Sequence, residues 1–499
     1  MNGHVFVVRG LLEAVAADAL IVPTDGTFTP RQAWWTALGI TRSTTPKSNG
    51  SARIRPFPDS PRPTWLLDVA ADEHRSVAGL VAGLNETLLQ IALDRPQLAD
   101  GRVRPLVALP TLGVGLGGYQ GVRGEVIEAL HHATEEFVAS SDFDVVFVVQ
   151  NAADYAAFQS IRREKSVDDT PEACRVLAEA IQTGDVAFLM GAGVSISAGL
   201  PTWDALLETL RHDALPDLNR GDFTKLGVLD QAQLLSKSSN GKSLGERAAE
   251  ATGMGSKKIP TLAHCLLASL GVAKAVTTNY DTLYEDAYKS AHGQHSIAVL
   301  PREEAAADRS WLLKMHGDVE VPDSIVLSRR DFVRYDAARR PLGSIVQFLM
   351  ATGHLVVIGA SMTDDNVLRL AHEVLAMNES NGHTRVLGTV VTLQDDPVRT
   401  ALWEGDFNYI AASSSSDTRV AARDLEILLD VVAMHVSDRS PYVLDPRYAE
   451  LLDDDERRIA EQLRDVARQL GAMTASKEDR WKSLKNVLGD MGAPNPHRQ

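Results

Sequence analysis

Four short segments place glycine, asparagine or histidine directly after apolar runs, and these residue types can hold a phosphate-bearing ligand and move a proton. The first segment is Gly191-Ala192-Gly193, which follows the apolar run 186–190. Two glycines around an alanine remove side-chain bulk and allow positive φ, so the backbone can approach a ligand closely. Backbone N–H groups at such a turn, followed by a helix N-terminus, suit a dinucleotide pyrophosphate. By itself this pattern is equally typical of an ordinary connection between a strand and a helix.

Three further segments of this kind also follow apolar runs. Open parallel sheets bind ligands beyond the carboxyl ends of their strands, where the ends of several strands meet. The pattern therefore predicts one ligand site assembled from all four turns. The three segments are Thr278-Asn279-Tyr280-Asp281, Met315-His316-Gly317-Asp318 and Gly359-Ala360-Ser361.

Taken together, the motifs GAGVS with GLPTW, TTNYD, MHGD and GASMTDD resemble the sirtuin family of NAD-consuming enzymes over about residues 170–412. The resemblance implies that Asn279 and His316 are the catalytic pair. An asparagine amide can hydrogen-bond a ribose hydroxyl or an incoming water, and an unperturbed imidazole suits a base near neutral pH. The residues that the resemblance assigns to NAD binding are Gly191, Ala192, Gly193, Ser195, Pro201, Trp203, Thr278, Asp281, Gly359 and Ser361. Asp281 also fits the cap of a following helix.

The cysteine content departs from the best-known members of this family. Protein deacetylases of the family carry a four-cysteine zinc module, and structural zinc needs four ligands at short spacing. This chain has only Cys174 and Cys265, so we expect neither zinc nor another metal. Leu200-Pro201-Thr202-Trp203 also replaces the Asp-Phe-Arg stretch of the deacetylases. Both differences resemble the bacterial defence branch, which hydrolyses NAD without an acetyl-lysine substrate.

The expected function is therefore cleavage of the nicotinamide–ribose bond of NAD, as in anti-phage effectors similar to the Thoeris effector, which deplete NAD when triggered. Two other functions stay open. One is a protein deacylase or ADP-ribosyltransferase, against which the missing zinc module counts. The other is an inactive nucleotide-sensing scaffold subunit, against which the presence of both Asn279 and His316 counts.

Residues 1–165 are predicted to form a separate α/β domain with a largely parallel sheet, because strand-like runs alternate with helical patterns. The stretch ALPTLGVGLGGYQGV, between a strand and a helix, resembles the phosphate-binding loop of macro domains. This resemblance implies a site for an ADP-ribose-type signalling nucleotide, formed by Asp18, Gly113, Gly115, Gly117 and Tyr119. The same glycines would equally serve a tight turn before a packed helix.

The rest of the chain is predicted to form a Rossmann-like sirtuin domain over 166–412 and a helical C-terminal extension over 413–499. Within the former, about residues 204–262 are expected to form a helical cap over the nucleotide. The boundary between the N-terminal domain and the sirtuin-like domain is placed in the polar stretch 151–169. The apolar stripes of the extension fit packing on their own domain or association between subunits.

The composition excludes some classes of binding partner. The chain of 499 residues has 50 basic and 66 acidic side chains, a net charge of −16, which disfavours binding to nucleic acid. Two cysteines fit a reducing compartment, and the chain shows neither a leader pattern nor an apolar run of spanning length. We therefore expect a cytoplasmic protein without a membrane partner. Because unregulated NAD hydrolysis would be toxic, we expect control by the macro-like domain, by the helical cap or by assembly into a homo-oligomer. A partner defence protein is a further expected partner.

Overall fold

The computed structural model describes residues 2–41, 53–70, 76–99, 101–115, 117–165, 170–238, 241–252, 258–360, 362–473 and 479–494. The chain forms two compact units. The N-terminal unit comprises Met1–Ala99, Arg104–Pro171 and Asp430–Gln499, and the central unit comprises Asp100–Val103 and Glu172–Leu429. The sequence predicts three consecutive domains, whereas the structure groups residues 430–499 with the N-terminal unit.

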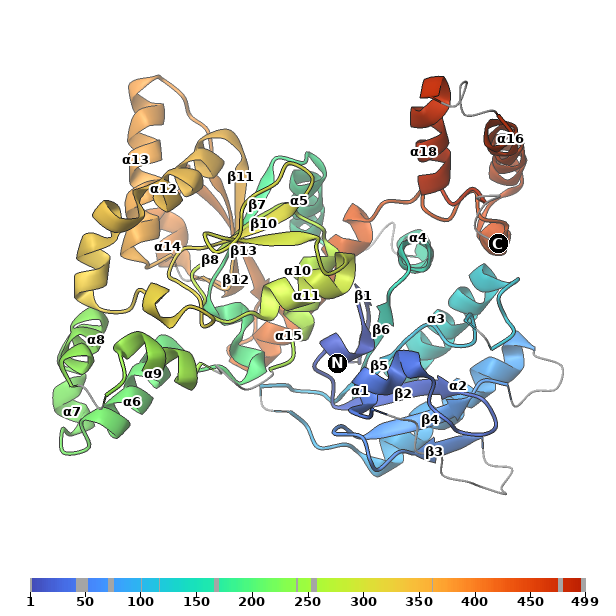
Figure 1. The fold of residues 1–499 in the computed structure, drawn as a ribbon, viewed down its shortest axis with the longest axis horizontal. Coiled ribbons are helices and arrows are strands. Elements are labelled where there is room, and N and C mark those ends of the chain that lie inside the picture. Colours follow the sequence, from blue (N-terminus) through green and yellow to red (C-terminus); the bar gives the residue numbers. More distant parts are fainter. Residues whose placement is uncertain are drawn as a thin grey trace. The chain divides into compact units, whose positions relative to one another are not determined.

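Six strands form the sheet of the N-terminal unit, in the order β1-β6-β5-β2-β4-β3 (Figure 1). All neighbouring strands pair in parallel except β3, which is antiparallel to β4 at the sheet edge. The predicted largely parallel sheet is therefore confirmed, and β3 is the strand that the sequence did not reveal. The strands are β1 (Val5–Arg9), β2 (Ala19–Thr24), β3 (Ile54–Pro56), β4 (Thr64–Asp68), β5 (Leu106–Leu109) and β6 (Asp144–Val149).

The helices of this unit share one hydrophobic core with the sheet. Helix α3, which follows the glycine-rich stretch, packs on the sheet through Val126 and Leu130, which are fully buried. The stretch 151–169, predicted as a polar boundary, contains the packed helix α4. The elements are η1 (Leu12–Ala14), η2 (Gln32–Trp34), α1 (Trp35–Leu38), α2 (Val77–Asp94), α3 (Arg123–Ser140), α4 (Ala152–Lys165), η6 (Pro446–Leu451), α16 (Asp454–Gly471), η7 (Asp479–Trp481) and α18 (Lys482–Asp490).

The C-terminal helices explain why residues 430–499 belong to this unit. Tyr448, Leu470 and Leu488 are part of the same core as α3. The hydroxyl of Tyr448 donates to Oδ1 of Asp154 at 2.5 Å. The apolar stripe of α16 is only partly covered, because Ile459 is 55% exposed.

Helix α2 has the length and the mean hydropathy, 1.2, of a membrane-spanning segment. Its leucines nevertheless divide between two faces. Leu80, Leu84 and Leu88 are buried in the core of the N-terminal unit, whereas Leu89 and Leu93 are exposed. The helix is thus packed as a core helix with an apolar outer edge.

Seven parallel strands form the sheet of the central unit, in the order β13-β12-β11-β7-β8-β10-β9. Every residue of β7 is buried, as expected for a central strand of a sheet covered on both faces. From β7 the chain continues to β8 on one side, and from β11 it continues to β12 on the other. The strands are β7 (Val186–Met190), β8 (Lys274–Thr277), β9 (Ile297–Leu300), β10 (Ser310–Lys314), β11 (His354–Ile358), β12 (Gly388–Gln394) and β13 (Phe407–Ser413).

Helices α6, α7, α8 and α9 form a group of their own beside this sheet (Figure 1). Their small core contains Leu207, Phe223 and Leu235, and Tyr280 joins it from the segment after β8. The helices of the unit are α5 (Glu172–Gln182), η3 (Ala192–Val194), η4 (Ile196–Ala198), α6 (Trp203–Ala214), α7 (Arg220–Phe223), α8 (Val228–Lys237), α9 (Leu244–Ala251), α10 (Leu262–Ser269), α11 (Leu283–His292), η5 (Pro322–Ser324), α12 (Arg329–Thr352), α13 (Asp365–Ser380), α14 (Pro397–Leu402) and α15 (Thr418–Val436), which runs into the N-terminal unit.

Candidate functional site

The candidate site lies where the winding of the central sheet reverses, between β7 and β11. Ligands of open parallel sheets bind in the crevice beyond such a reversal. Gly191 follows β7 and Gly359 follows β11, so both glycines stand at this point. Here a cavity of about 750 Å³ opens, and the segments after β7, β8 and β11 all line it.

The glycines allow these two segments to pack directly on each other. A Cβ on Gly191 would lie 2.7 Å from Cα of Ala360, and a Cβ on Gly193 would lie 2.8 Å from Cα of Gly359. The N–H groups of Gly191 and Gly193 donate to the carbonyls of Ile358 and Gly359, at 3.0 and 2.9 Å. The sequence suggested that N–H groups at this turn bind a pyrophosphate. In the structure these two N–H groups instead hold the two segments together and are not free for a ligand.

Most of the predicted NAD-binding residues line the cavity. Thr278 and Asn279 reach it from the segment after β8. Ser361 lies outside the described residues. The predicted residues that line it are Gly191, Ala192, Gly193, Ser195, Pro201, Trp203, Thr278, Asn279, Asp281 and Gly359.

The orientation of the Asn279 amide follows from its partners. Its Nδ2 donates to the carbonyl of Gly191 at 3.0 Å and to Oγ of Ser195 at 3.2 Å. Because a carbonyl only accepts, the nitrogen must be the atom that faces Gly191. Both amide hydrogens are then used, and Oδ1 is the remaining acceptor for a hydroxyl or a water in the cavity.

Ser195 connects Asn279 to two further side chains. Its hydroxyl donates to Oδ2 of Asp281 at 3.0 Å and lies 3.3 Å from Nε2 of His264. Nδ1 of His264 accepts from the N–H of Thr261, so Nε2 carries the ring hydrogen and donates to Ser195. Burial lowers the pKa of His264 to about 4, which keeps it neutral. His264 thus holds the serine that in turn holds Asn279.

His316 lies outside the cavity wall. Its side chain is 1% exposed, and its ring packs 5.4 Å from the ring of Phe332 and 6.2 Å from that of Tyr335. Burial is the main cause that lowers the pKa of His316, with Arg339 adding to the effect and Asp364 opposing it. The imidazole is therefore neutral at pH 7, as a base must be, but Phe332 and Asp364 stand between it and the cavity.

Asp364 joins His316 to the cavity. Its Oδ2 lies 3.4 Å from Nε2 of His316, and its Oδ1 accepts the N–H groups of Asn366 and Val367 as the N-cap of α13. The carboxylate lines the cavity. Asp364 was not predicted as a site residue, although an aspartate before an apolar helical pattern is a helix-start signal that would place it just after the strand.

The cavity wall carries more negative than positive charge. Among the residues that the structure describes, four aspartates and one arginine, Arg329, line it. Arg329 pairs with Asp230 of α8, which draws its charge toward the helices α6 to α9. The predicted cap region supplies part of the wall through Gly227, Val228 and Thr252. The aspartates are Asp204, Asp281, Asp364 and Asp365.

The N-terminal unit contains a second cavity, of about 600 Å³. Gly113, Gly115 and Gly117 line it, as the macro-like interpretation predicts. Asp18 and Tyr119 are not among the described residues that line this cavity, and both make contacts within the fold. Asp18 accepts the N–H groups of Ala99 and Leu106 at 2.8 and 2.7 Å. The ring of Tyr119 packs against Gly113, where an added Cβ would lie 2.7 Å from it.

A charged pair closes one side of this second cavity. Nε and Nη2 of Arg123 donate to the two oxygens of Asp154, both at 2.6 Å, and both residues line the cavity. Tyr448 completes the group through its bond to Asp154. Neither Arg123 nor Asp154 was singled out from the sequence, because their partner Tyr448 lies about three hundred residues away.

The cysteines do not form a reactive or metal-binding pair. Both are buried free thiols, and burial raises their pKa values to about 11 for Cys174 and about 12 for Cys265. Among the residues that the structure describes, no three His, Cys, Asp or Glu side chains gather as metal ligands.

Comparison with known proteins identifies similarity within the central unit. Residues 273–409 match the family described as SIR2-like domain. NAD(+) hydrolase ThsA of Enterococcus faecium is 29% identical over 203 residues, which cover 40% of this chain and 41% of that protein. Defense-associated sirtuin 2 of Bacillus subtilis is 23% identical over 216 residues, which cover 42% of this chain and 21% of that protein.

Residues 273–409 are thus similar to a SIR2-like domain, and the chain is similar to an NAD hydrolase and to a defence-associated sirtuin. The matched part spans only about two fifths of the hydrolase's length and a fifth of the sirtuin's. A chain from "Structural Basis for the Mechanism and Regulation of Sir2 Enzymes" aligns at 14% identity with a TM-score of 0.30, covering 52% of this chain and 98% of that one. The macro-like interpretation of the N-terminal unit stays a prediction.

Proposed function

We propose that this chain hydrolyses NAD to nicotinamide and ADP-ribose in the cavity between β7 and β11. One observation carries the proposal: Asn279 stands in the cavity wall with both amide hydrogens engaged and Oδ1 left as an acceptor. The relation to NAD(+) hydrolases ThsA supports this choice of substrate.

The chemistry follows from the groups in the wall. The nicotinamide–ribose bond breaks with its electron pair leaving on nicotinamide, and the ribose carbon gains oxocarbenium character. A water then bonds to that carbon and releases one proton. Asn279 Oδ1 orients a ribose hydroxyl or this water. The Asp364 carboxylate is the proton acceptor at the wall, and neutral His316 behind it stabilises the proton, a contribution of about 10²–10⁴-fold for a positioned base.

We further propose that hydrolysis serves anti-phage defence by depleting cytoplasmic NAD when a trigger arrives. The similarity to a defence-associated sirtuin supports this role. A switch from about 1% to about 99% active molecules requires a ligand that prefers the active state by about 10⁴-fold. Association of several copies, or a partner defence protein, would supply part of that preference.

The N-terminal cavity is the proposed receptor for such a ligand. Its three glycines favour an ADP-ribose-type nucleotide, whose phosphates need close backbone approach. Binding of ADP-ribose to the purified chain, measured by calorimetry and lost in Gly113→Val, tests this role. Binding that Gly113→Val leaves unchanged would contradict it.

Product analysis tests the hydrolase proposal. The purified chain is incubated with NAD, with and without ADP-ribose, and nicotinamide and free ADP-ribose are quantified for wild type, Asn279→Ala, His316→Ala and Asp364→Asn. Ser344→Ala, at an exposed position of α12, is the matched control. Equal amounts of both products from wild type and the control, and at least about 100-fold less from the three variants, support hydrolysis.

Other product patterns would replace the proposal. ADP-ribose attached to protein would indicate a transferase, and loss of an acyl group from a peptide would indicate a deacylase. Bound NAD that yields no nicotinamide under any condition would indicate a nucleotide-sensing scaffold.

A further inference from the structure

Lys314 is buried in the central unit and has no role in the chemistry above. It is the last residue of β10, and its side chain is 1% exposed. In the sheet it lies opposite Thr277, the last residue of β8. The chain beyond Thr277 carries Asn279 and then enters α11. Lys314 therefore stands beside the loop that presents the Asn279 amide.

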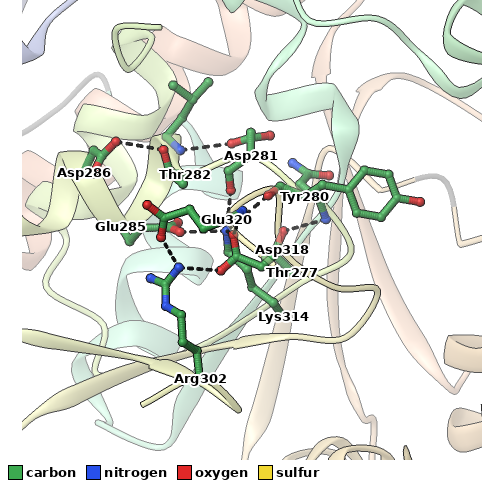
Figure 2. A network of polar contacts seen from close by, with 12 residues as sticks. Thr277, Tyr280, Asp281, Thr282, Glu285, Asp286, Arg302, Lys314, Asp318 and Glu320 are labelled. Atoms are coloured by element: carbon green, nitrogen blue, oxygen red, sulfur yellow. Dashed lines mark hydrogen bonds and ion pairs between the residues drawn. The ribbon is translucent and has the colours of Figure 1, made fainter. Parts of the chain in front are cut away.

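The ammonium group of Lys314 binds this loop directly. Its Nζ donates to the carbonyl of Tyr280 at 3.2 Å and to the carbonyl of Asp281 at 2.6 Å. The same atom lies 2.7 Å from Oε1 of Glu285 and 3.4 Å from Oδ1 of Asp318. Figure 2 shows Lys314 among these acceptors, with Arg302 on the outer side of the network. Two of its acceptors are thus the backbone positions that follow Asn279.

A charged group at this place is unfavourable unless it is compensated. Burial removes the ammonium group from water, and the N-terminus of α11 repels a cation. Burial lowers the pKa of Lys314, but Glu285 and Asp318 outweigh it and raise the pKa above its ordinary value. Burial in turn raises the pKa of Glu285 to about 7, against the effect of Lys314. Because an apolar pair can fill such space without these penalties, the charge points to a task other than packing.

The loop is held on both sides of Asn279. On the strand side, the N–H of Asn279 donates to Oγ1 of Thr277 at 3.0 Å. On the helix side, the carbonyl of Tyr280 accepts from Lys314 and from the N–H of Val319. A shift of these carbonyls would rotate the peptide planes next to Asn279 and move its Oδ1.

We propose that Lys314 is a positioning residue for the amide of Asn279, acting through the carbonyls of Tyr280 and Asp281, with Glu285 as its counter-charge. This inference rests on the proposed NAD hydrolysis. The proposal gives the buried Lys314–Glu285 ion pair a role in positioning Asn279 and not only in stabilising the core.

The test replaces the whole pair by apolar residues. In Lys314→Met/Glu285→Leu the buried charges disappear together, so the fold is retained while the carbonyl of Asp281 loses its donor and the carbonyl of Tyr280 keeps only the N–H of Val319. We expect the thermal unfolding midpoint of wild type, a KM for NAD within about 3-fold, and a kcat lowered by about 10- to 100-fold, the effect of a small misplacement of a catalytic group. Arg302→Met is the matched control. This variant removes a cation of the same network. Among the described residues, Arg302 pairs with Asp318, Glu320 and Glu303, and the kcat of Arg302→Met should equal that of wild type.

Each result decides between positioning and packing. A folded double variant with the kcat of wild type, or with a raised KM and an unchanged kcat, would overturn the proposal. A double variant that does not fold would show that Lys314 serves stability, and would overturn it as well. Wild type that releases no nicotinamide would refute the proposed hydrolysis itself, which is a separate outcome.

Discussion

Ser195→Ala separates two roles for the serine that the sequence assigned to NAD binding. In the structure its hydroxyl has three partners: Nδ2 of Asn279, Oδ2 of Asp281 and Nε2 of His264. The alanine removes the hydroxyl that accepts from two donors. Nε2–H of His264 and one amide hydrogen of Asn279 are then left without a partner. Ser195 itself is only 3% exposed, so water replaces the hydroxyl poorly.

The magnitude follows from these contacts. An unsatisfied buried polar group costs about 1–3 kcal/mol, so we expect the central unit to lose about 2–4 kcal/mol of its free energy of unfolding. Asn279 loses one of two anchors, worth about 1 kcal/mol, and the resulting freedom of Oδ1 should lower kcat by about 10- to 50-fold. KM for NAD should change by less than about 3-fold, because the carbonyl of Gly191 still holds the amide in the cavity wall.

Steady-state kinetics of nicotinamide release, with thermal unfolding of the same samples, measures both effects. Ser269→Ala is the control, because its hydroxyl bonds the carbonyl of Cys265 within α10. It removes a serine hydroxyl from the helix that carries His264. A Ser195→Ala variant with a raised KM and an unchanged kcat would refute the reasoning and return Ser195 to direct NAD binding.

Three further predictions follow from the same geometry. The folded pKa of His264 is lowered from 6.5 to about 4, so the unfolded chain takes up this proton first as the pH falls below about 6.5. The free energy of unfolding should therefore be about 2 kcal/mol lower at pH 5 than at pH 7.5. Thermal unfolding at the two pH values should show this loss in wild type and a smaller one in His264→Gln. The described residues of the cavity wall include four aspartates and one paired arginine. NADP, with about two more negative charges, should therefore be cleaved with a kcat/KM at least about 10-fold below that of NAD. Equal values would show that the extra phosphate lies outside this wall. In Gly191→Ala the new Cβ would lie 2.7 Å from Cα of Ala360, which should destabilise the central unit by about 1–3 kcal/mol, whereas Gly121→Ala, with nothing within 4 Å, should unfold like wild type.

Four of the seven strands of the central sheet could be predicted from the sequence, because each of the four is a compact apolar run that ends at a polar or small residue, whereas β9, β12 and β13 were not identified. β7, β8, β10 and β11 all lie where the runs placed them. Parallel strands end at one sheet edge, so Gly191, Asn279 and Gly359 came together as expected. The antiparallel edge strand β3 escaped, because three residues, Ile54–Pro56, give no periodic signal.

What the sequence could not reveal are contacts between distant side chains. Pairing rules predict that His316 stands at a strand end, but not that Phe332 covers it, since that depends on the packing of α12. The same holds for Asp364, whose second oxygen meets His316 only in the folded unit. Tyr448 is the example with the longest sequence separation, because its bond to Asp154 joins η6 to α4 within the N-terminal unit.

The central claim is that the Asn279 amide enables cleavage of NAD already bound in the cavity. The most direct test measures NAD binding and single-turnover nicotinamide release together, in wild type and in Asn279→Ala. We predict that both bind NAD, with dissociation constants within about 3-fold, and that nicotinamide release falls at least about 100-fold in the variant, since an interaction made in the transition state lowers turnover rather than binding. Release from bound NAD at the wild-type rate in Asn279→Ala would contradict the account.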